Sequence, residues 1–491
     1  MGMKGEKSKM EKSPKKPLGR KAKKTIISAA ITVLSLTAII LLNIIASALT
    51  EKYSIFTADI TSMQAFELTE QSKQIAENVG KNVKITFLSE KRDYENRDPY
   101  CKQTSVIANE MAKVSNGKIS VEYVDIVTNP TAASIYGDTS ITANDIAVSC
   151  GDKIKILKVS DLFTFDVYSA EYQYISSSQS EQVIDNAIVT VTSDIVTKTA
   201  IVSDNSSKNY EYFVSTLEEN NYEVTEISLE DDEIESDIQM IIIYEPEKDF
   251  TENALLKLEN FLVNNESFGK NLIYVPDIDG NTHQKLDSFI NMFGIAVNDG
   301  IAFEYDDNSR YYESNYYEYI VCDFGSDLYR ENISKDRYTP VMTGASRPLY
   351  IKNENVEPLL VLSEKSGIMP YTADENWSME DSVTGNVCVM AQAFLGDDEK
   401  ESSLIVAGSG TMFSETYFVN ALGNRSYIMT MLASINERSS EIISVSDKVI
   451  TNFDINAGAS VRFWIGFVIY ALIPLMILGC GLTVYLVRRG K

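Results

Sequence analysis

The stretch Ile238-Gln239-Met240-Ile241-Ile242-Ile243-Tyr244 decides the fold of the central part of the chain. Its continuous apolar run is typical of a strand that is buried on both faces of a parallel sheet. A second buried strand is expected at Asn271–Val275, and the residues between the two predict an amphipathic helix at 251–263. Strands that alternate with helices predict right-handed βαβ units and a parallel sheet.

The same alternation continues on both sides of this centre. Towards the N-terminus, the sequence predicts a strand at 199–202, a helix at 210–220 and a strand at 222–227. Towards the C-terminus the pattern loosens after Gly300. Order returns with predicted strands at 358–363, 387–393 and 404–407 and a helix at 425–436.

A smaller α/β module is expected before this sheet, over about 68–165. Predicted strands at Val83–Leu88 and Ile119–Ile126 flank a helix that begins at Asp98-Pro99, a favourable N-cap and first helical residue. A hairpin around Gly151-Asp152 follows. The order suggests a thioredoxin-like module, but a redox role requires a cysteine pair at the start of the first helix, where only Cys101 is present.

Two long apolar segments lie near the ends of the chain. Residues 25–49 and 463–487 contain no charged residue, and each is long enough for a helix to cross a hydrocarbon core of roughly 30 Å. Ten Lys or Arg residues precede the first segment, and such a basic flank favours the cytoplasmic side. We therefore expect two membrane spans with the central part outside. The alternative for the first segment is a cleaved signal peptide ending at Ala46-Ser47-Ala48.

The charge is unevenly distributed along the sequence. The formal net charge is −26, of which residues 1–24 contribute +8 and residues 488–491 contribute +3, which leaves −37 for the middle. So acidic a surface argues against a nucleic-acid partner, because counterion release requires basic side chains on the protein. The acidity is also consistent with solubility alone.

The spacing of the cysteines does not define a disulfide framework. Cys101, Cys150, Cys322 and Cys388 lie in the central part at long spacings, and Cys480 lies in the second apolar segment. Disulfides form outside the cytoplasm, but the sequence does not give their connectivity. Their redox state stays open.

Candidate chemistry is sparse. His283 is the sole histidine and follows Asp277 and Asp279 in an expected loop, where no second imidazole or cysteine cluster completes a transition-metal site. The spacing of these acids does not match a calcium loop. Gly408-Ser409-Gly410 after a strand resembles an anion-binding turn but lacks a third glycine. The acidic run 229–237 is expected to be a solvated loop. These observations predict no catalytic residue, metal site or cofactor.

Tyrosines gather in the loosely patterned segment 305–319. An aromatic surface for glycan or protein and an irregular insertion or exposed sheet edge are both compatible with this pattern. The residues concerned are Tyr305, Tyr311, Tyr312, Tyr316, Tyr317 and Tyr319.

An ordered set of loose motifs resembles the GldG-like auxiliary proteins of ABC-2-type transporters, named for the gliding-motility machinery. The set spans nearly the whole chain. It comprises Phe66–Ser72, Val83–Leu88, Gly117–Asp125, Asn129-Pro130, Glu181-Gln182, Ile238–Pro246, Phe289–Ile295, Leu404–Gly408, the helix before Asn436, Pro474-Leu475 and Arg488-Arg489.

The resemblance implies a pair of extracytoplasmic α/β domains, the second like a glutamine amidotransferase but without its catalytic cysteine. It also implies an ABC ATPase and a multi-span permease as partners. The sequence departs from the family at Ser203-Asp204-Asn205-Ser206, where a Gly-His-Gly-Glu-like turn is usual, and at Asn264–Lys270, where Gly-Gly is usual. No ligand site is carried over.

The resulting expectation is a non-catalytic, membrane-anchored auxiliary subunit of an ABC-2-type transporter in the cell membrane, two-pass, with both termini cytoplasmic and the large domain extracytoplasmic. That domain would bind cargo or a partner. The alternatives are a stand-alone cell-surface binding or sensing protein and a hydrolase in which His283, or a carboxylate in its place, serves as base. The expected boundaries are a basic tail at 1–24, a span at 25–49, a small α/β domain at 50–180, a linker helix at 181–197, an amidotransferase-like α/β domain at 198–440 with an insertion around 300–356, a linker at 441–461, a span at 462–487 and a tail at 488–491.

Overall fold

The structure is a computed structural model of the chain. It describes residues 65–450, except for short gaps, and the isolated positions 34, 37, 41, 479 and 481. The gaps are 137–140, 170–171, 205–208, 280–282, 306–309, 312–316, 331–332, 334–338, 397–399, 420–421 and 444.

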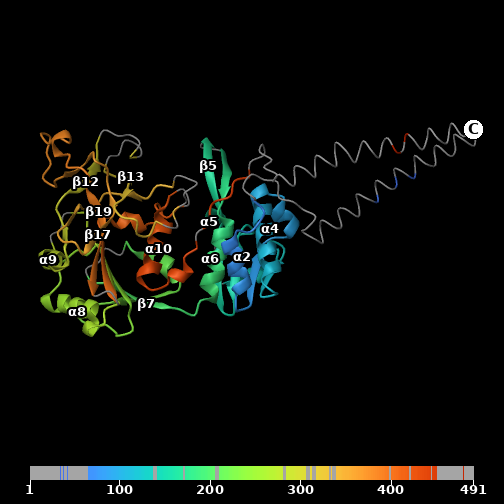
Figure 1. Cartoon of the computed structure of the whole chain (residues 1–491), viewed down its shortest axis with the longest axis horizontal. Coiled ribbons are helices and arrows are strands. Elements are labelled where there is room, and N and C mark those ends of the chain that lie inside the picture. The colour runs from blue at the N-terminus through green and yellow to red at the C-terminus, as the bar shows by residue number, and fades with distance from the viewer. Residues whose placement is uncertain are drawn as a thin grey trace, which may run out of the picture. The chain divides into compact units, whose positions relative to one another are not determined.

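The first domain is a four-stranded sheet with helices packed on it (Figure 1). Its strands lie in the order β2-β1-β3-β4; β1 and β2 are parallel, whereas β3 is antiparallel to both β1 and β4. Helices α4 and α6 contact the sheet, and α2 packs against both helices. The strands are β1 (Val83–Phe87), β2 (Ile119–Tyr123), β3 (Ile146–Cys150) and β4 (Lys153–Leu157), and the helices are α2 (Glu70–Asn78), α3 (Lys91–Glu95), α4 (Pro99–Val114), η2 (Pro130–Tyr136), α5 (Val159–Leu162) and α6 (Ser180–Thr192).

Local sequence explains where these helices begin. The Asp98 side chain accepts a hydrogen bond from the Tyr100 amide, and Pro99 takes the first helical position of α4, where a missing N–H costs nothing. Thr69 caps α2 in the same way through the Ser72 amide. The helix start predicted at Asp98-Pro99 is confirmed.

Helix α6 has a different role from the linker that the sequence predicted at 181–197. Its apolar side, including Ile184 and Ile188, is buried in the core of the first domain together with Ile85 and Ile146. The helix therefore completes the first domain. A hairpin of β5 (Phe163–Ser169) and β6 (Tyr172–Ser178), which the sequence did not predict, precedes α6 and extends away from the four-stranded sheet (Figure 1).

The second domain contains a ten-stranded mixed sheet. Its strand order is β11-β16-β19-β20-β10-β9-β7-β8, and β17 pairs with β19 and β14. The five strands from β8 to β20 are parallel, and β19 is antiparallel to β20. These strands are β7 (Thr197–Val202), β8 (Tyr222–Ile227), β9 (Met240–Tyr244), β10 (Asn271–Val275), β11 (Ile295–Val297), β14 (Asp323–Phe324), β16 (Leu349–Ile351), β17 (Val356–Val361), β19 (Cys388–Gly396) and β20 (Glu401–Ala407).

Strand β9 shows why its apolar run decides this domain. Met240, Ile242 and Tyr244 face one hydrophobic core, and Ile241 and Ile243 face the other. Each face is covered by helices, so successive side chains of a strand must all be apolar. Residues of α7 and α10 belong to the first core and residues of α8 and α9 to the second. The helices are α7 (Glu211–Glu218), α8 (Glu252–Val263), α9 (Gln284–Met292) and α10 (Asn424–Ile435).

The insertion predicted around 300–356 is divided between small two-stranded sheets and the ten-stranded sheet, which β14 and β16 join. Strand β12 pairs with β18, and β13 pairs with β15. These elements are β12 (Ile301–Glu304), β13 (Ile320–Val321), β15 (Met342–Thr343) and β18 (Ser366–Met369), and the short helical turns of the domain are η3 (Asn264–Glu266), η4 (Glu380–Ser382), η5 (Gly410–Phe413) and η6 (Ser439–Glu441).

The chain returns from the second domain to the first through residues 438–450, which we call the strap. The Lys448 amide of the strap donates a hydrogen bond to the Ser178 carbonyl, and the Ser178 amide donates one to the Lys448 carbonyl; both hydrogen bonds are 2.9 Å long. The Ile450 amide donates to the Tyr100 hydroxyl at 3.0 Å. The linker expected at 441–461 is therefore packed on the first domain over its described residues.

The strap carries a lysine into a buried acidic pair. The Lys448 ammonium lies 2.5 Å from a Glu181 oxygen, and both side chains are less than one-tenth exposed. Asp185 lies one helical turn after Glu181 and accepts a hydrogen bond from the Ser72 hydroxyl at 2.5 Å. Burial, opposed by the Ser72 hydrogen bond and reinforced by the Glu181 charge, raises the pKa of Asp185 to about 8.

Replacing Asp185 with Asn is expected to stabilise the protein at alkaline pH. The pKa of Asp185 in the folded chain is raised above the ordinary value of 3.8, so the carboxyl ionises at lower pH in the unfolded chain than in the folded one. The folded state therefore loses stability progressively as pH rises from the ordinary pKa of 3.8 to about 8. Asn stays neutral and can still accept from Ser72. At pH 9 the variant should be more stable than the wild type by at least about 1 kcal/mol, the order of magnitude of one pKa unit. Denaturant unfolding at pH 5 and pH 9 measures this, and an equal effect at both pH values would contradict it.

The mixed α/β class is present, but the two-span membrane description requires correction. Among the described residues no helix has the length and apolar character to cross a membrane. The longest of them, α4, has 16 residues and a polar side, whereas a span needs about 20 apolar residues. The structure therefore does not support the transmembrane, two-pass assignment. The predicted spans themselves lie outside the described residues, apart from positions 34, 37, 41, 479 and 481.

Candidate functional site: a polar groove between the domains

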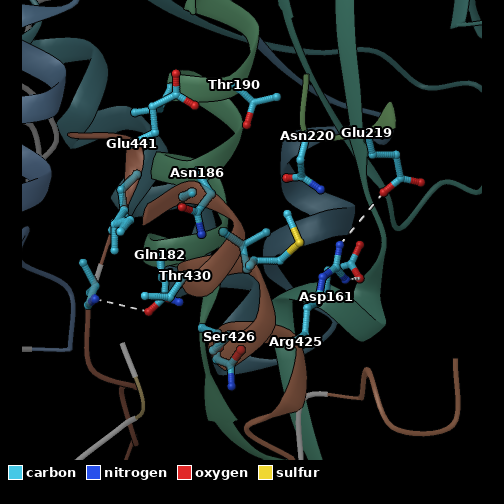
Figure 2. Close-up of a pocket in the computed structure, with 18 of the residues that line it drawn as sticks. Asp161, Gln182, Asn186, Thr190, Glu219, Asn220, Arg425, Ser426, Thr430 and Glu441 are labelled. Atoms are coloured by element: carbon cyan, nitrogen blue, oxygen red, sulfur yellow. Dashed lines mark hydrogen bonds and ion pairs between the residues drawn. The ribbon is translucent and has the colours of Figure 1, made fainter. Parts of the chain in front are cut away.

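A groove of about 440 Å³ lies between α6 of the first domain and α10 of the second (Figure 2). The end of strand β4, the loop after α7 and the strap complete its walls. It is therefore enclosed by elements that are far apart in the sequence.

Helix α6 supplies one wall. Gln182, Asn186 and Thr190 are spaced four residues apart, which places them on one side of the helix, and they point into the groove (Figure 2). The opposite side of α6 carries the buried apolar residues that hold it on the first domain. Amphipathic packing of the helix thus presents a row of uncharged polar side chains to the groove.

Helix α10 supplies the facing wall, with Ser426, Met429, Thr430 and Ala433. The side chains of Asn186, Thr190 and Ser426 have no hydrogen-bond partner among the described residues, and Asn186 and Ser426 are half-buried. Half-buried polar groups without a protein partner are suited to bind a ligand or water.

Charged groups lie at one end of the groove. The Arg425 guanidinium lies 3.7 Å from an Asp161 oxygen and 3.9 Å from a Glu219 oxygen, ion pairs that are too long for hydrogen bonds. Lys155 donates to the Asn220 side-chain oxygen at 3.0 Å and to the Glu219 carbonyl at 3.4 Å. Burial, and then the positive charge of Arg425, lowers the pKa of Lys155 to about 8.

Replacing Arg425 with Gln is expected to raise the pKa of Lys155 while leaving it below the ordinary value of 10.5. The reason is that the variant removes the repulsion by a like charge, but burial, the larger cause, remains. The pH profile of Lys155 labelling by an amine reagent, read by peptide mass spectrometry, measures the shift. Exposed Lys352 is the internal control. A Lys155 profile unchanged by the substitution would contradict the assignment.

The other end of the groove is closed by Arg438 and the strap. Arg438 pairs with Glu441 at 2.5 Å, donates to the Asn220 carbonyl at 3.0 Å, and stacks over the Tyr222 ring at 4.8 Å. The Ser193 hydroxyl donates to Glu441 at 2.7 Å. These contacts fix the strap to the start of the second domain.

The residues singled out from the sequence lie elsewhere and do not form one site. His283 immediately precedes α9 and is 2% exposed; its Nε2 has no hydrogen-bond partner among the described residues. Burial lowers its pKa, despite the nearby Asp249 and Asp277 carboxylates. Asp277 accepts from the Asp279 amide, as in a local turn. Within the described residues no group of His, Cys, Asp and Glu could hold a metal ion.

The Gly408-Ser409-Gly410 segment is a tight turn from β20 into η5. The Ser409 and Thr411 hydroxyls lie 2.7 Å apart, and the Tyr244 hydroxyl donates to the Gly410 carbonyl at 2.7 Å. A Cβ added at Gly410 would lie 2.1 Å from a Glu245 oxygen, so glycine permits this close approach. Glu245 itself has a positive φ of 44° and accepts from the Asn209 side chain at 3.1 Å. This carboxyl edge of the sheet is the second place where a doubly wound domain could bind a ligand.

The four central cysteines are free thiols. Burial raises the pKa of Cys101 to about 11 and that of Cys388 to about 12, and it also raises the pKa of Cys322. Such thiols are poor nucleophiles because the thiolate is the reactive form. Cys480 lies outside the described residues.

Two described tyrosines of the 305–319 segment contact neighbouring residues. Tyr319 stacks on Tyr417 with ring centres 5.9 Å apart, and Tyr311 forms a bridge with Ile320. Tyr312 and Tyr316 lie outside the described residues. The acidic loop at 229–237 closes on itself through Asp232, which accepts from the Ser228 amide, and Lys257 donates to two of its carbonyls.

Sequence reasoning identified no residue as part of this groove, although Glu181-Gln182 was among the motifs of the resemblance. The four-residue spacing of Gln182, Asn186 and Thr190 was readable as a polar stripe on a predicted helix. The facing wall of the groove could not be predicted in the same way, because only the folded chain shows that α10 lies opposite this stripe.

Comparisons with known proteins give one family match, over part of the chain. Residues 62–160, about a fifth of the chain, match a domain of unknown function (DUF7088). No curated protein matches the sequence.

Solved structures show weak similarity. A carbohydrate deacetylase, Agd3, is 9% identical with a TM-score of 0.26, and the match covers 43% of this chain and 30% of that one. PurLQS from Thermotoga maritima is 13% identical with a TM-score of 0.25, and the match covers 49% of this chain and all of that one. Similarity at this level carries no functional argument.

Proposed function

We propose that this protein is a non-catalytic binding subunit that holds its ligand in the groove between α6 and α10. The observation that carries the proposal is the set of three side chains, Asn186, Thr190 and Ser426, that lie in the groove without a hydrogen-bond partner among the described residues. Polar groups held at fixed positions in a concave site are what a binding pocket requires.

Three features support a non-catalytic role. His283 is enclosed, and burial lowers its pKa. The buried thiols have raised pKa values. The polar walls of the groove carry amides and hydroxyls, and its acids and bases are paired at its two ends. A hydrolase would need a nucleophile, a base and an oxyanion site in one place.

The partner in this proposal comes from the sequence resemblance. We propose that the protein acts as the auxiliary subunit of an ABC-2-type transporter, together with an ABC ATPase and a permease. The motifs that carry the resemblance include Glu181-Gln182 at the start of α6, the helix that lines the groove.

Affinity purification of the tagged full chain from its native host in mild detergent tests the partner. The expected result is recovery of an ABC ATPase and a multi-span permease, identified by mass spectrometry, in constant ratio to the tagged chain. A bait of unrelated sequence with the same tag is the control. Absence of both subunits would overturn the transporter assignment and leave a stand-alone binding or sensing protein as the working description.

A further inference from the structure

We infer that the ligand of the groove is an extended peptide segment of a partner protein. This inference rests on the proposed binding function and specifies the chemistry of its ligand. The segment would lie along α6 with its backbone bonded to Asn186, to the Thr190 hydroxyl and to the side-chain amide nitrogen of Gln182, whose oxygen is taken by the strap.

The chain itself shows how α6 binds peptide backbone. The Gln182 side-chain oxygen accepts a hydrogen bond from the Val445 amide of the strap at 3.1 Å, which is drawn as a dashed line in Figure 2. At the C-terminal end of α6, the Thr190 carbonyl accepts from the Asn221 side chain at 2.7 Å. One member of the polar row is therefore already bonded to main chain, whereas Asn186 and the Thr190 hydroxyl are not.

The chemistry of the walls matches a peptide better than other polar ligands. Amide and hydroxyl side chains pair with backbone N–H and C=O groups without a charge to neutralise. Val183, Val189 and Met429 lie between the polar residues and can receive apolar side chains. Tyr222, the one aromatic residue among the described lining, is 4% exposed and covered by Arg438, so it offers no open ring face to a cyclic ligand such as a sugar.

The length of the row sets the length of the segment. Eight residues separate Gln182 from Thr190, which corresponds to about 12 Å along the helix. An extended chain covers this distance with about four residues at 3.3–3.6 Å each.

The test uses two probes with the purified full chain: a pool of random tetrapeptides with blocked termini, and a matched pool of neutral tetrasaccharides. Bound molecules are separated from free ones by gel filtration and identified by mass spectrometry. The variant Asn186→Leu/Ser426→Ala removes two unpartnered groups of the groove. The control variant Asn291→Leu changes an exposed residue of α9 that does not line the groove.

The expected result is that the wild-type chain and Asn291→Leu retain peptides, and that the groove variant binds the same peptides at least tenfold more weakly. If the wild-type chain retains saccharides instead, and the groove variant does not, the peptide inference is overturned but the proposed binding function stands. Retention of neither pool would overturn the peptide inference, and the recovery of transporter subunits then decides the proposed function independently. Equal peptide binding by the wild type and the groove variant would place the site elsewhere.

Discussion

Replacing Lys448 with Met is expected to lower the free energy of unfolding by about 3–5 kcal/mol. Lys448 lies 2.5 Å from Glu181, its side chain is 8% exposed, and its ammonium also donates to the Glu67 carbonyl. Met fills the space of the lysine stem but leaves Glu181 buried next to Asp185 without a cation. The cost arises mainly from that unpaired charge, because the pair itself stabilises little beyond its own desolvation.

Two further variants make this expectation specific. Lys73→Met removes an exposed lysine that pairs with Glu70 one turn earlier on α2, and it should change stability little. Adding Glu181→Gln to Lys448→Met removes the unpaired charge and should restore part of the loss. Denaturant unfolding of the full chain at pH 7 measures all three. A Lys448→Met variant as stable as the wild type would show that the strap is not held on the first domain in this way.

Replacing Ile242 with Ala is expected to destabilise the second domain by about 2–5 kcal/mol. Ile242 lies in the middle of β9, which pairs with β7 on one side and β10 on the other, and its side chain is fully buried. The substitution removes apolar contacts and leaves a cavity in the core below α7 and α10, where neighbouring strands cannot move to fill it.

The matched control is Leu256→Ala on α8, whose side chain is 51% exposed. It should change stability by less than about 0.5 kcal/mol, as surface substitutions away from buried features usually do. Ile242→Val, which removes one methylene, should cost about 0.5–1.5 kcal/mol. The midpoint of denaturant unfolding should therefore be highest for Leu256→Ala, lower for Ile242→Val and lowest for Ile242→Ala. Equal midpoints for Ile242→Ala and Leu256→Ala would contradict the buried position of β9.

The alternation of apolar runs and amphipathic helices could be predicted from the sequence because it is a local signal. The run at 238–244 became β9, the helix at 251–263 became α8, and Asp98-Pro99 begins α4. In each case the residues that determine the element lie within it or directly beside it.

The features that define the candidate site depend on long-range contacts and could not be predicted in this way. Nothing in the sequence of the strap indicates that it crosses back to Ser178 and Tyr100. For the same reason α6 was expected to be a linker, although its apolar side completes the first core. The two terminal apolar segments led to a two-span description that no described helix supports.

The central claim is that the groove between α6 and α10 binds the ligand. Amide hydrogen exchange of the full chain, with and without the blocked tetrapeptide pool, tests it most directly, because ligand contact slows exchange locally. The account predicts added protection along 182–193 and 426–435 and none around Glu245 or 408–411. Protection confined to that carboxyl edge of the sheet, with α6 and α10 unchanged, would contradict it and move the binding site to the second domain alone.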